Sequence, residues 1–300
     1  MRFGLLCSAQ AGGEDLPPET GQGFRDYLDF NVEAEELGFH SSFLVEHHFT
    51  GWNQVSATLM LLTCLAMRTT ALRLGSAVIT LPWHNPVLLA EDAATLDLIS
   101  GGRLDFGIGK GYRHSEFNGF QVPQEEAEAR FEEAVEVITR SWTERSRFSH
   151  HGRFWRFEDV VVEPPPAQRP HPPFWMAAGS PASIRRAATH GFNLMLDQYA
   201  STEQIRERLA LYAPNARPTG ARSIRWASRW RASSTWRAIG RTPRRLSPGR
   251  PSTPGARWTY RARRDEPAAR MCSPTRRRVA PPRSTRSLAR LRKSAPSWRH

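Results

Sequence analysis

The chain has 300 residues, enough for one large (β/α) barrel or for two smaller domains. Its three cysteines include no CxxC pair, which argues against a disulfide framework or a thiolate zinc site and is typical of a reducing, cytoplasmic compartment. The apolar stretch at the N-terminus is too short for a signal peptide or a spanning helix, so we expect no membrane association.

The net charge of +13 is distributed unevenly along the chain. Residues 1–213 contain 18 Lys and Arg against 27 Asp and Glu, whereas residues 214–300 contain 24 against 2. The basic character therefore belongs almost entirely to the second region. We treat the two regions as separate parts of the chain.

Residues 1–213 repeat a pattern in which an apolar strand is followed by an amphipathic helix. Short hydrophobic runs predict strands at residues 3–7, 42–47, 72–81, 103–109, 173–178 and 192–196. Apolar spacing, together with capping and breaking residues, predicts helices at residues 24–37, 55–69, 86–100, 125–142, 181–190 and 201–212. An insertion at residues 148–171 is expected to form a short hairpin or edge strand, with His150 and His151 in solvent.

The unbroken alternation of strand and helix indicates an α/β fold. It favours a (β/α)8 TIM barrel over a doubly wound sheet, because no long connection marks a reversal of strand order. Only about six β/α units are recognisable, so we expect the barrel to be incomplete.

Titratable side chains follow the second predicted strand. The run Phe43-Leu44-Val45 leads directly into Glu46, His47 and His48. Reactive groups of α/β barrels collect at the carboxyl ends of strands, although a histidine there can also be a hydrogen-bonded structural residue. A metal centre that also includes His84 is conceivable, but adjacent strand residues point to opposite faces, so we predict no metal.

Two later segments are candidates for binding an anion. Ser180-Pro181-Ala182-Ser183 opens a helix directly after a strand, where free backbone N–H groups and hydroxyls would face one ligand. Gly107-Ile108-Gly109-Lys110-Gly111 combines close backbone approach with a positive charge. Its spacing matches neither a P-loop nor a dinucleotide-binding fingerprint, and a loop of this kind is often only a turn.

Three separated stretches are informative together: FLVEHHF, LGSAVITLPWHNPVLLAEDAATLDLISGGRLDFGIGKG and PFWMAAGSPASIRRAATHGFN. In this order, and over roughly residues 1–213, the chain resembles the bacterial luciferase-like, flavin-dependent monooxygenases, which are (β/α)8 barrels. The resemblance implies that His47 is the catalytic histidine and that Glu46 is its acidic neighbour.

The resemblance also implies a set of cofactor-binding residues. Lys110 takes the place of an arginine at the flavin phosphate, which Ser180 and Ser183 would also contact, and a cis peptide bond under the isoalloxazine ring would fall at Ala77-Val78. Gly109 and Gly179 complete the set. Bacterial luciferase has a cysteine and a glutamate at these two positions, so light emission and an aldehyde substrate are not implied.

The chemistry implied by the resemblance is oxygenation of a small organic substrate by reduced FMN and O2 through a flavin C4a-peroxide. A separate reductase would supply the reduced flavin, since the chain has no dinucleotide-binding fingerprint. An F420-dependent oxidoreductase on the same fold is the alternative. Members of the family often form homodimers, so a homodimer is a further expectation.

Residues 214–300 differ in composition from the barrel region. They contain 11 Pro but only six Ile, Leu, Val and Phe together, which is typical of a disordered segment and too little for two further β/α units. A change of reading frame near residues 212–217 is our preferred explanation. The alternative is a degenerate barrel with an Arg-rich arm that binds nucleic acid, because arginines interleaved with tryptophans can neutralise phosphates and stack on bases.

Overall fold

The computed structural model describes residues 2–13, 16–196 and 199–213. The Arg- and Pro-rich region at residues 214–300 lies outside the described residues, so its boundary and character stay predictions. Within the described part of the chain, no helix is long and apolar enough to cross a membrane.

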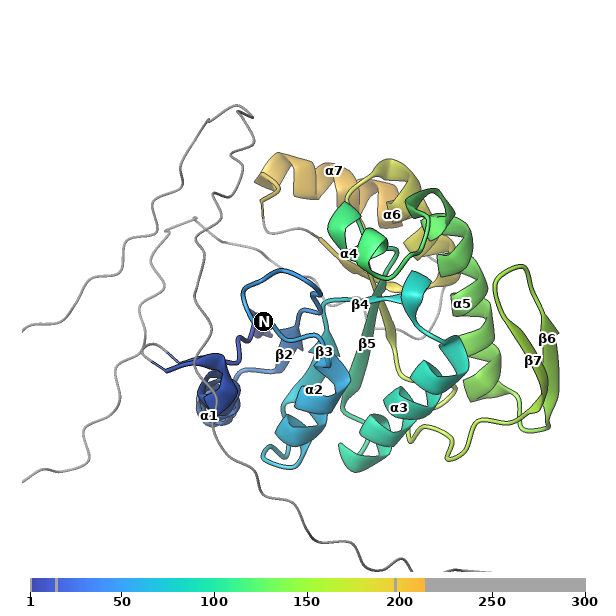
Figure 1. The fold of residues 1–300 in the computed structure, drawn as a ribbon. Coiled ribbons are helices and arrows are strands. Elements are labelled where there is room, and N and C mark those ends of the chain that lie inside the picture. The colour runs from blue at the N-terminus through green and yellow to red at the C-terminus, as the bar shows by residue number, and fades with distance from the viewer. Residues whose placement is uncertain (1, 14–15, 197–198, 214–300) are drawn as a thin grey trace, which may run out of the picture. The chain divides into compact units, whose positions relative to one another are not determined.

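A curled parallel sheet forms the centre of the fold (Figure 1). Its seven strands are β1 (Gly4–Cys7), β2 (Ser41–Leu44), β3 (Arg73–Ser76), β4 (Ile79–Thr80), β5 (Leu104–Gly109), β8 (Phe174–Ala177) and β9 (Asn193–Met195). They pair in the order β1-β2-β3-β5-β8-β9, with β4 also paired to β5, and every pairing is parallel. Strand order follows chain order, which confirms the expected α/β fold as part of a (β/α) barrel.

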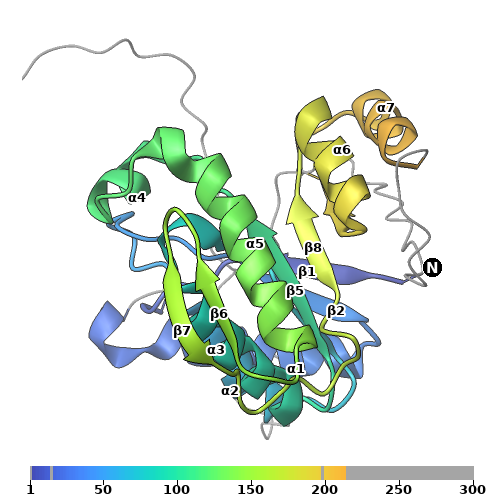
Figure 2. The same ribbon diagram turned by 90° about the vertical axis from the view of Figure 1, so that its right-hand side faces the viewer.

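Helices connect the strands and cover the outer face of the sheet (Figures 1 and 2). The α-helices are α1 (Gln22–Glu36), α2 (Thr58–Ala66), α3 (Pro86–Ile99), α4 (His114–Gly119), α5 (Ala127–Thr143), α6 (Pro181–His190) and α7 (Thr202–Tyr212). Short 3-10 turns occupy η1 (Pro18–Thr20), η2 (Leu81–Trp83) and η3 (Gln124–Glu126). The insertion forms an antiparallel hairpin of β6 (Phe148–His151) and β7 (Arg156–Val160), as predicted.

Buried aromatic rings join the sheet to its helices. Phe106 of β5 meets Trp142 of α5 edge to face, with ring centroids 5.3 Å apart, and both side chains are fully buried. The Trp142 indole N–H donates to the carbonyl of Ala90 in α3 at 3.0 Å. The Trp142 side chain of α5 therefore contacts both β5 and α3, and its buried N–H group is hydrogen-bonded.

Local sequence signals define the ends of α3 as predicted. The Asn85 side chain accepts hydrogen bonds from the backbone N–H groups of Val87 and Leu88 at 3.0 and 3.2 Å. Pro86 then occupies the first helical turn, where its missing N–H has no consequence. Gly101 and Gly102 follow the helix with φ of 67° and 81°, a conformation that favours glycine.

Gly107 allows an unusually close approach between β3 and β5. A Cβ atom at this position would lie 1.7 Å from the carbonyl oxygen of Ser76, so no other residue fits. The Ser76 hydroxyl donates to the Gly107 carbonyl at 2.8 Å and accepts from its N–H at 2.9 Å. This contact fixes the sheet at the point where β3 ends.

Several predicted elements need correction. The single strand predicted at residues 72–81 is wrong, because a cis peptide bond between Ala77 and Val78 divides it into β3 and β4. The second strand ends at Leu44, so Glu46 and His47 lie in the loop beyond it. Helix α4 was not predicted, since its sequence HSEFNG is polar and short. His150 is buried rather than in solvent, because its Nε2 pairs with Glu133 at 3.2 Å.

Candidate functional site

The predicted site residues follow different strands but share one edge of the sheet. Because β2, β3, β5 and β8 are parallel, the segments that follow them all leave the sheet at its carboxyl edge. The last residue of β5, Gly109, and these segments carry the predicted residues, which are Glu46, His47, Ala77, Val78, Lys110, Gly179, Ser180 and Ser183. The topology thus places the whole predicted set on the side of the sheet where barrel sites form.

His47 pairs with Glu116, a residue that the sequence did not single out. The Nδ1 atom of His47 lies 3.0 Å from Oε1 of Glu116, and the same oxygen accepts the backbone N–H of His48 at 3.0 Å. Because a carboxylate oxygen accepts hydrogen bonds, the contact assigns the donor role to the Nδ1–H of His47 and leaves Nε2 free of Glu116. The His47 side chain is 17% exposed and that of Glu116 is 4% exposed, so the acid supports the imidazole from the buried side.

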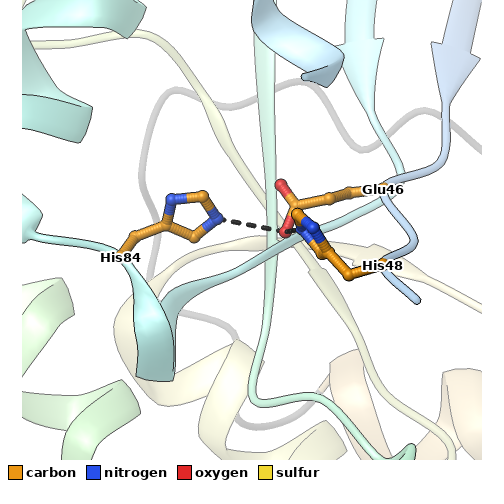
Figure 3. A group of neighbouring side chains, drawn as sticks. All are labelled: Glu46, His48 and His84. Atoms are coloured by element: carbon orange, nitrogen blue, oxygen red, sulfur yellow. Dashed lines mark hydrogen bonds and ion pairs between the residues drawn. The ribbon is translucent and has the colours of Figure 1, made fainter. Parts of the chain in front are cut away.

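Glu46 does not contact His47. Its Oε1 atom instead lies 3.2 Å from Nε2 of His48 and 3.0 Å from Nε2 of His84 (Figure 3). Burial by itself raises the pKa of Glu46, but the hydrogen bonds and positive charge of His48 and His84 outweigh it, so the pKa lies below its usual value. Glu46 is therefore a buried, ionised carboxylate between two imidazoles.

A cluster of aromatic side chains, called here the aromatic wall, lies beside Glu46, His48 and His84. Trp83 stacks on Phe120 with an interplanar angle of 18° and meets Phe117 edge to face. The Phe120 ring contacts the rings of His48 and Phe49, with centroid distances of 4.8 and 4.9 Å. The loop after β2 is thereby packed against helix α4, which also carries Glu116.

The cis peptide bond between Ala77 and Val78 lies next to Gly109. A Cβ atom on Gly109 would come within 2.6 Å of Cγ2 of Val78. Since Val78 is branched at Cβ and has little rotamer freedom, only glycine fits here without movement. The Val78 side chain therefore packs directly against the backbone of Gly109, which joins the end of β5 to the segment after β3.

Lys110 is held by an ion-pair network rather than pointing freely into solvent. Its Nζ lies 3.2 Å from Oε2 of Glu128 in α5, and Arg186 of α6 pairs with the other oxygen of the same carboxylate. Arg186 also pairs with Glu132 at 2.6 Å. The network connects the loop after β5 to α6, the helix capped by Ser180, and brings a second cation, Arg186, that was not predicted.

Ser180 and Ser183 form a capping box at the start of α6. The Ser180 hydroxyl accepts the N–H of Ser183 at 3.3 Å, and the Ser183 hydroxyl accepts the N–H of Ser180 at 3.2 Å. Ser180 is exposed and Ser183 is partly buried, and Gly179 borders a small hollow of about 190 Å³ between α6 and α7. The helix start is therefore open to solvent and offers hydroxyls and a positive dipole end.

A second surface hollow lies away from this edge of the sheet. An open depression of about 810 Å³ runs between α5 and the β6–β7 hairpin, where its lining includes Glu133, His150 and His190. Glu133 accepts hydrogen bonds from His150 and from three backbone N–H groups of the hairpin turn, so it fastens the hairpin to α5. These groups are engaged in structural contacts, and we place the functional site at the carboxyl edge of the sheet.

Comparison with known families gives an extensive match. The sequence model of the family described as luciferase-like monooxygenase matches residues 1–231. A monooxygenase from Streptomyces bottropensis has a similar crystal structure, with a TM-score of 0.66 and 34% sequence identity over 73% of this chain and 68% of that one.

Two curated relatives represent the range of cofactors. The oxygenase component of a flavin-dependent trigonelline monooxygenase from Acinetobacter baylyi is 33% identical over 65% of this chain and 54% of its own length. An F420-dependent glucose-6-phosphate dehydrogenase from Intrasporangium calvum is 33% identical over 56% of this chain and 52% of its own. The chain thus spans about half the length of the curated relatives that it matches.

Proposed function

Because the chain belongs to the luciferase-like monooxygenase family, we propose that it is a flavin-dependent monooxygenase that oxygenates a small organic substrate. The observation that carries this proposal is the buried Glu116 behind His47 at the carboxyl edge of the sheet. An acid behind an imidazole fixes its tautomer and leaves one nitrogen to exchange protons. The whole protein's substrate and activity are part of the proposal, since the match covers about half of each curated relative.

The role of His47 follows from this arrangement. Proton exchange at Nε2 would take a proton from, or return one to, a group bound at the site, while Nδ1 stays engaged with Glu116. The Glu46 carboxylate would support His47 indirectly. Its negative charge is balanced by His48 and His84, and it holds the loop that carries His47.

The residues present fit a phosphorylated flavin. Ser180, Ser183 and the first N–H groups of α6 would hold its phosphate, and Lys110 would add charge once it turns from Glu128. The backbone at Ala77 and Val78, next to Gly109, would lie against the ring, and Gly179 would leave space at the helix start. The bound reduced flavin would supply the two electrons with which O2 is activated.

FMN is the proposed cofactor, and a separate flavin reductase is the proposed electron source. The name of the Acinetobacter relative, an oxygenase component, supports a two-component system. The F420-dependent relative supports the alternative, in which the same site binds a deazaflavin and transfers hydride. Both cofactors carry a phosphate, so the anion site alone does not distinguish them.

Titration of the purified full-length chain would decide between the two cofactors. We expect binding of reduced FMN, weaker binding of riboflavin because it lacks the phosphate, and oxygen uptake when a reductase and NADH are added. His47→Asn should leave FMN binding within about threefold but lower turnover by about 10²–10⁴-fold. Tight binding of F420 with none of FMN would overturn the choice of cofactor, and binding of neither would overturn the proposal itself.

A further inference from the structure

Three side chains near His47 direct possible metal ligands at one point. Oε1 of Glu46, Nε2 of His48 and Nε2 of His84 all lie within 4.8 Å of one another (Figure 3). Glu46 and His48 lie in the loop after β2 and contact each other, whereas His47 between them contacts Glu116. The loop conformation therefore separates His47 from this group and leaves the other three together.

We propose that Glu46, His48 and His84 form a binding site for one divalent transition-metal ion such as Zn²⁺. Two imidazoles and one carboxylate are a common ligand set for such ions, and they leave further coordination positions for water. The inference does not depend on the flavin, because His47, Lys110 and Ser180 are not among the ligands.

The distances suit an ion of this size. Oε1 of Glu46 lies 3.2 Å from the His48 nitrogen and 3.0 Å from the His84 nitrogen. With an ion about 2.1 Å from each of these atoms, the ligand–ion–ligand angle would be about 90–100° for each Glu46–His pair. Such angles suit ligands that occupy one face of the ion. The spacing of Glu46 from each histidine is thus already that of two ligands on one ion.

Burial and charge also favour a cation at this point. The Glu46 side chain is only 1% exposed, and no Lys or Arg pairs with it within the described residues. A buried carboxylate is costly unless it is compensated, as His48 and His84 compensate Glu46 here, and a bound cation would take over that role. The His84 side chain is 29% exposed, so an ion can enter from that side.

Neighbouring groups would hold the carboxylate in place while it binds the ion. The backbone N–H of Thr80 and the indole N–H of Trp83 each donate to Oε1 of Glu46 at 3.4 Å. Such outer contacts orient metal ligands and strengthen binding. The adjacent residues Trp83 and His84 tie this site to the aromatic wall.

The experiment uses the full-length chain, purified without a histidine tag and stripped with chelator. We expect one equivalent of Co²⁺ to give visible d–d bands and Zn²⁺ to displace the Co²⁺. Competition between the protein and a chromophoric chelator would measure the binding of Zn²⁺. His84→Ala and Glu46→Gln should each weaken binding at least tenfold. The matched control is His151→Ala, because His151 is an exposed histidine that pairs with Glu158 in the hairpin, and it should bind like the parent.

Thermal unfolding separates loss of the site from loss of the fold. Zn²⁺ should raise the melting temperature of the parent and of His151→Ala by mass action, but not that of His84→Ala. Circular dichroism must show that His84→Ala is folded; if it is not, Glu46→Gln, which keeps the shape of the side chain, decides. Absence of binding to the parent, or equal binding by the folded variants and the parent, would overturn the proposal.

Discussion

The Nδ1 atom of His47 lies 3.0 Å from a carboxylate oxygen of Glu116, although the two residues are 69 positions apart. One comes from the loop after β2 and the other from α4. The pair is possible only because the sheet brings the ends of β2 and β5 together, and it defines which nitrogen of His47 is available for proton exchange.

Replacing Glu116 should disturb the tautomer of His47. In Glu116→Ala, Nδ1 loses its acceptor, so ¹⁵N NMR of the imidazole should show a mixture of tautomers in place of the Nδ1-protonated form. Turnover should fall by at least about tenfold, but by less than on loss of His47 itself. Glu125→Gln, which changes an exposed acid, is the matched control and should change neither. An unchanged imidazole spectrum in Glu116→Ala would contradict the assigned role.

Glu128 should compete with a phosphate for Lys110 and Arg186. Its hydrogen bonds with these two cations lower its pKa, so it is ionised at neutral pH. Glu128→Gln should therefore strengthen FMN binding by a few fold, whereas Lys110→Ala should weaken it, as isothermal titration would measure. Riboflavin is the control ligand, since its affinity should respond to neither change. Equal effects on the two ligands would place Lys110 away from the phosphate.

The contact between Gly109 and Val78 should be sensitive to one added methyl group. Gly109→Ala would place Cβ within 2.6 Å of Val78 Cγ2, so that Val78 or the Gly109 backbone must shift. We expect weaker flavin binding, by about tenfold or more, in fluorescence titrations. The double variant Val78→Ala/Gly109→Ala removes the clashing carbon and should recover most of the affinity. If it does not, the loss has another cause.

Glu35 should make stability dependent on pH. Burial raises its pKa, but hydrogen bonds from the N–H groups of Ala71, Leu72 and Thr70 and the charge of Arg103 bring the net pKa below 4.5. A lowered pKa in the folded state means that the carboxylate stabilises the protein above pH 4.5, and that this contribution is lost as the pH falls through the folded-state value.

Denaturation of Glu35→Gln at pH 7 should show a loss of about 1 kcal/mol, since the carboxylate is partly exposed. The difference from the parent should shrink when both are measured below the folded-state pKa of Glu35. Glu33→Gln on the same helix is the control, because Glu33 is exposed, and should show little loss at either pH. A constant difference would show that charge is not the cause.

The fold class followed from the sequence because each β/α unit carries its own signals. Asn85 and Ser180 mark helix starts by hydrogen bonds to residues two or three positions later, which depend only on local sequence. The boundaries at Leu44 and at Ala77 were missed. Strand ends depend on which neighbour continues the ladder, and β4 pairs with β5 alone.

The site was only partly predictable for the same reason. His47 was identified from its place after an apolar run, whereas Glu116 lies in a polar segment that resembles an ordinary surface helix. Its burial to 4% becomes visible only when α4 packs on the loop after β2. The pairing of Glu46 with His84 likewise spans 38 positions and leaves no mark in local spacing.

The order of strands in the sheet repeats their order in the chain, and the proposed binding groups come from four separate β/α units. A bound flavin would therefore touch segments that no short fragment of the chain contains together. The flavin would therefore bind only molecules in which the sheet is assembled. Well above its dissociation constant, the ligand should raise the unfolding midpoint of the protein in proportion to the logarithm of the ligand concentration.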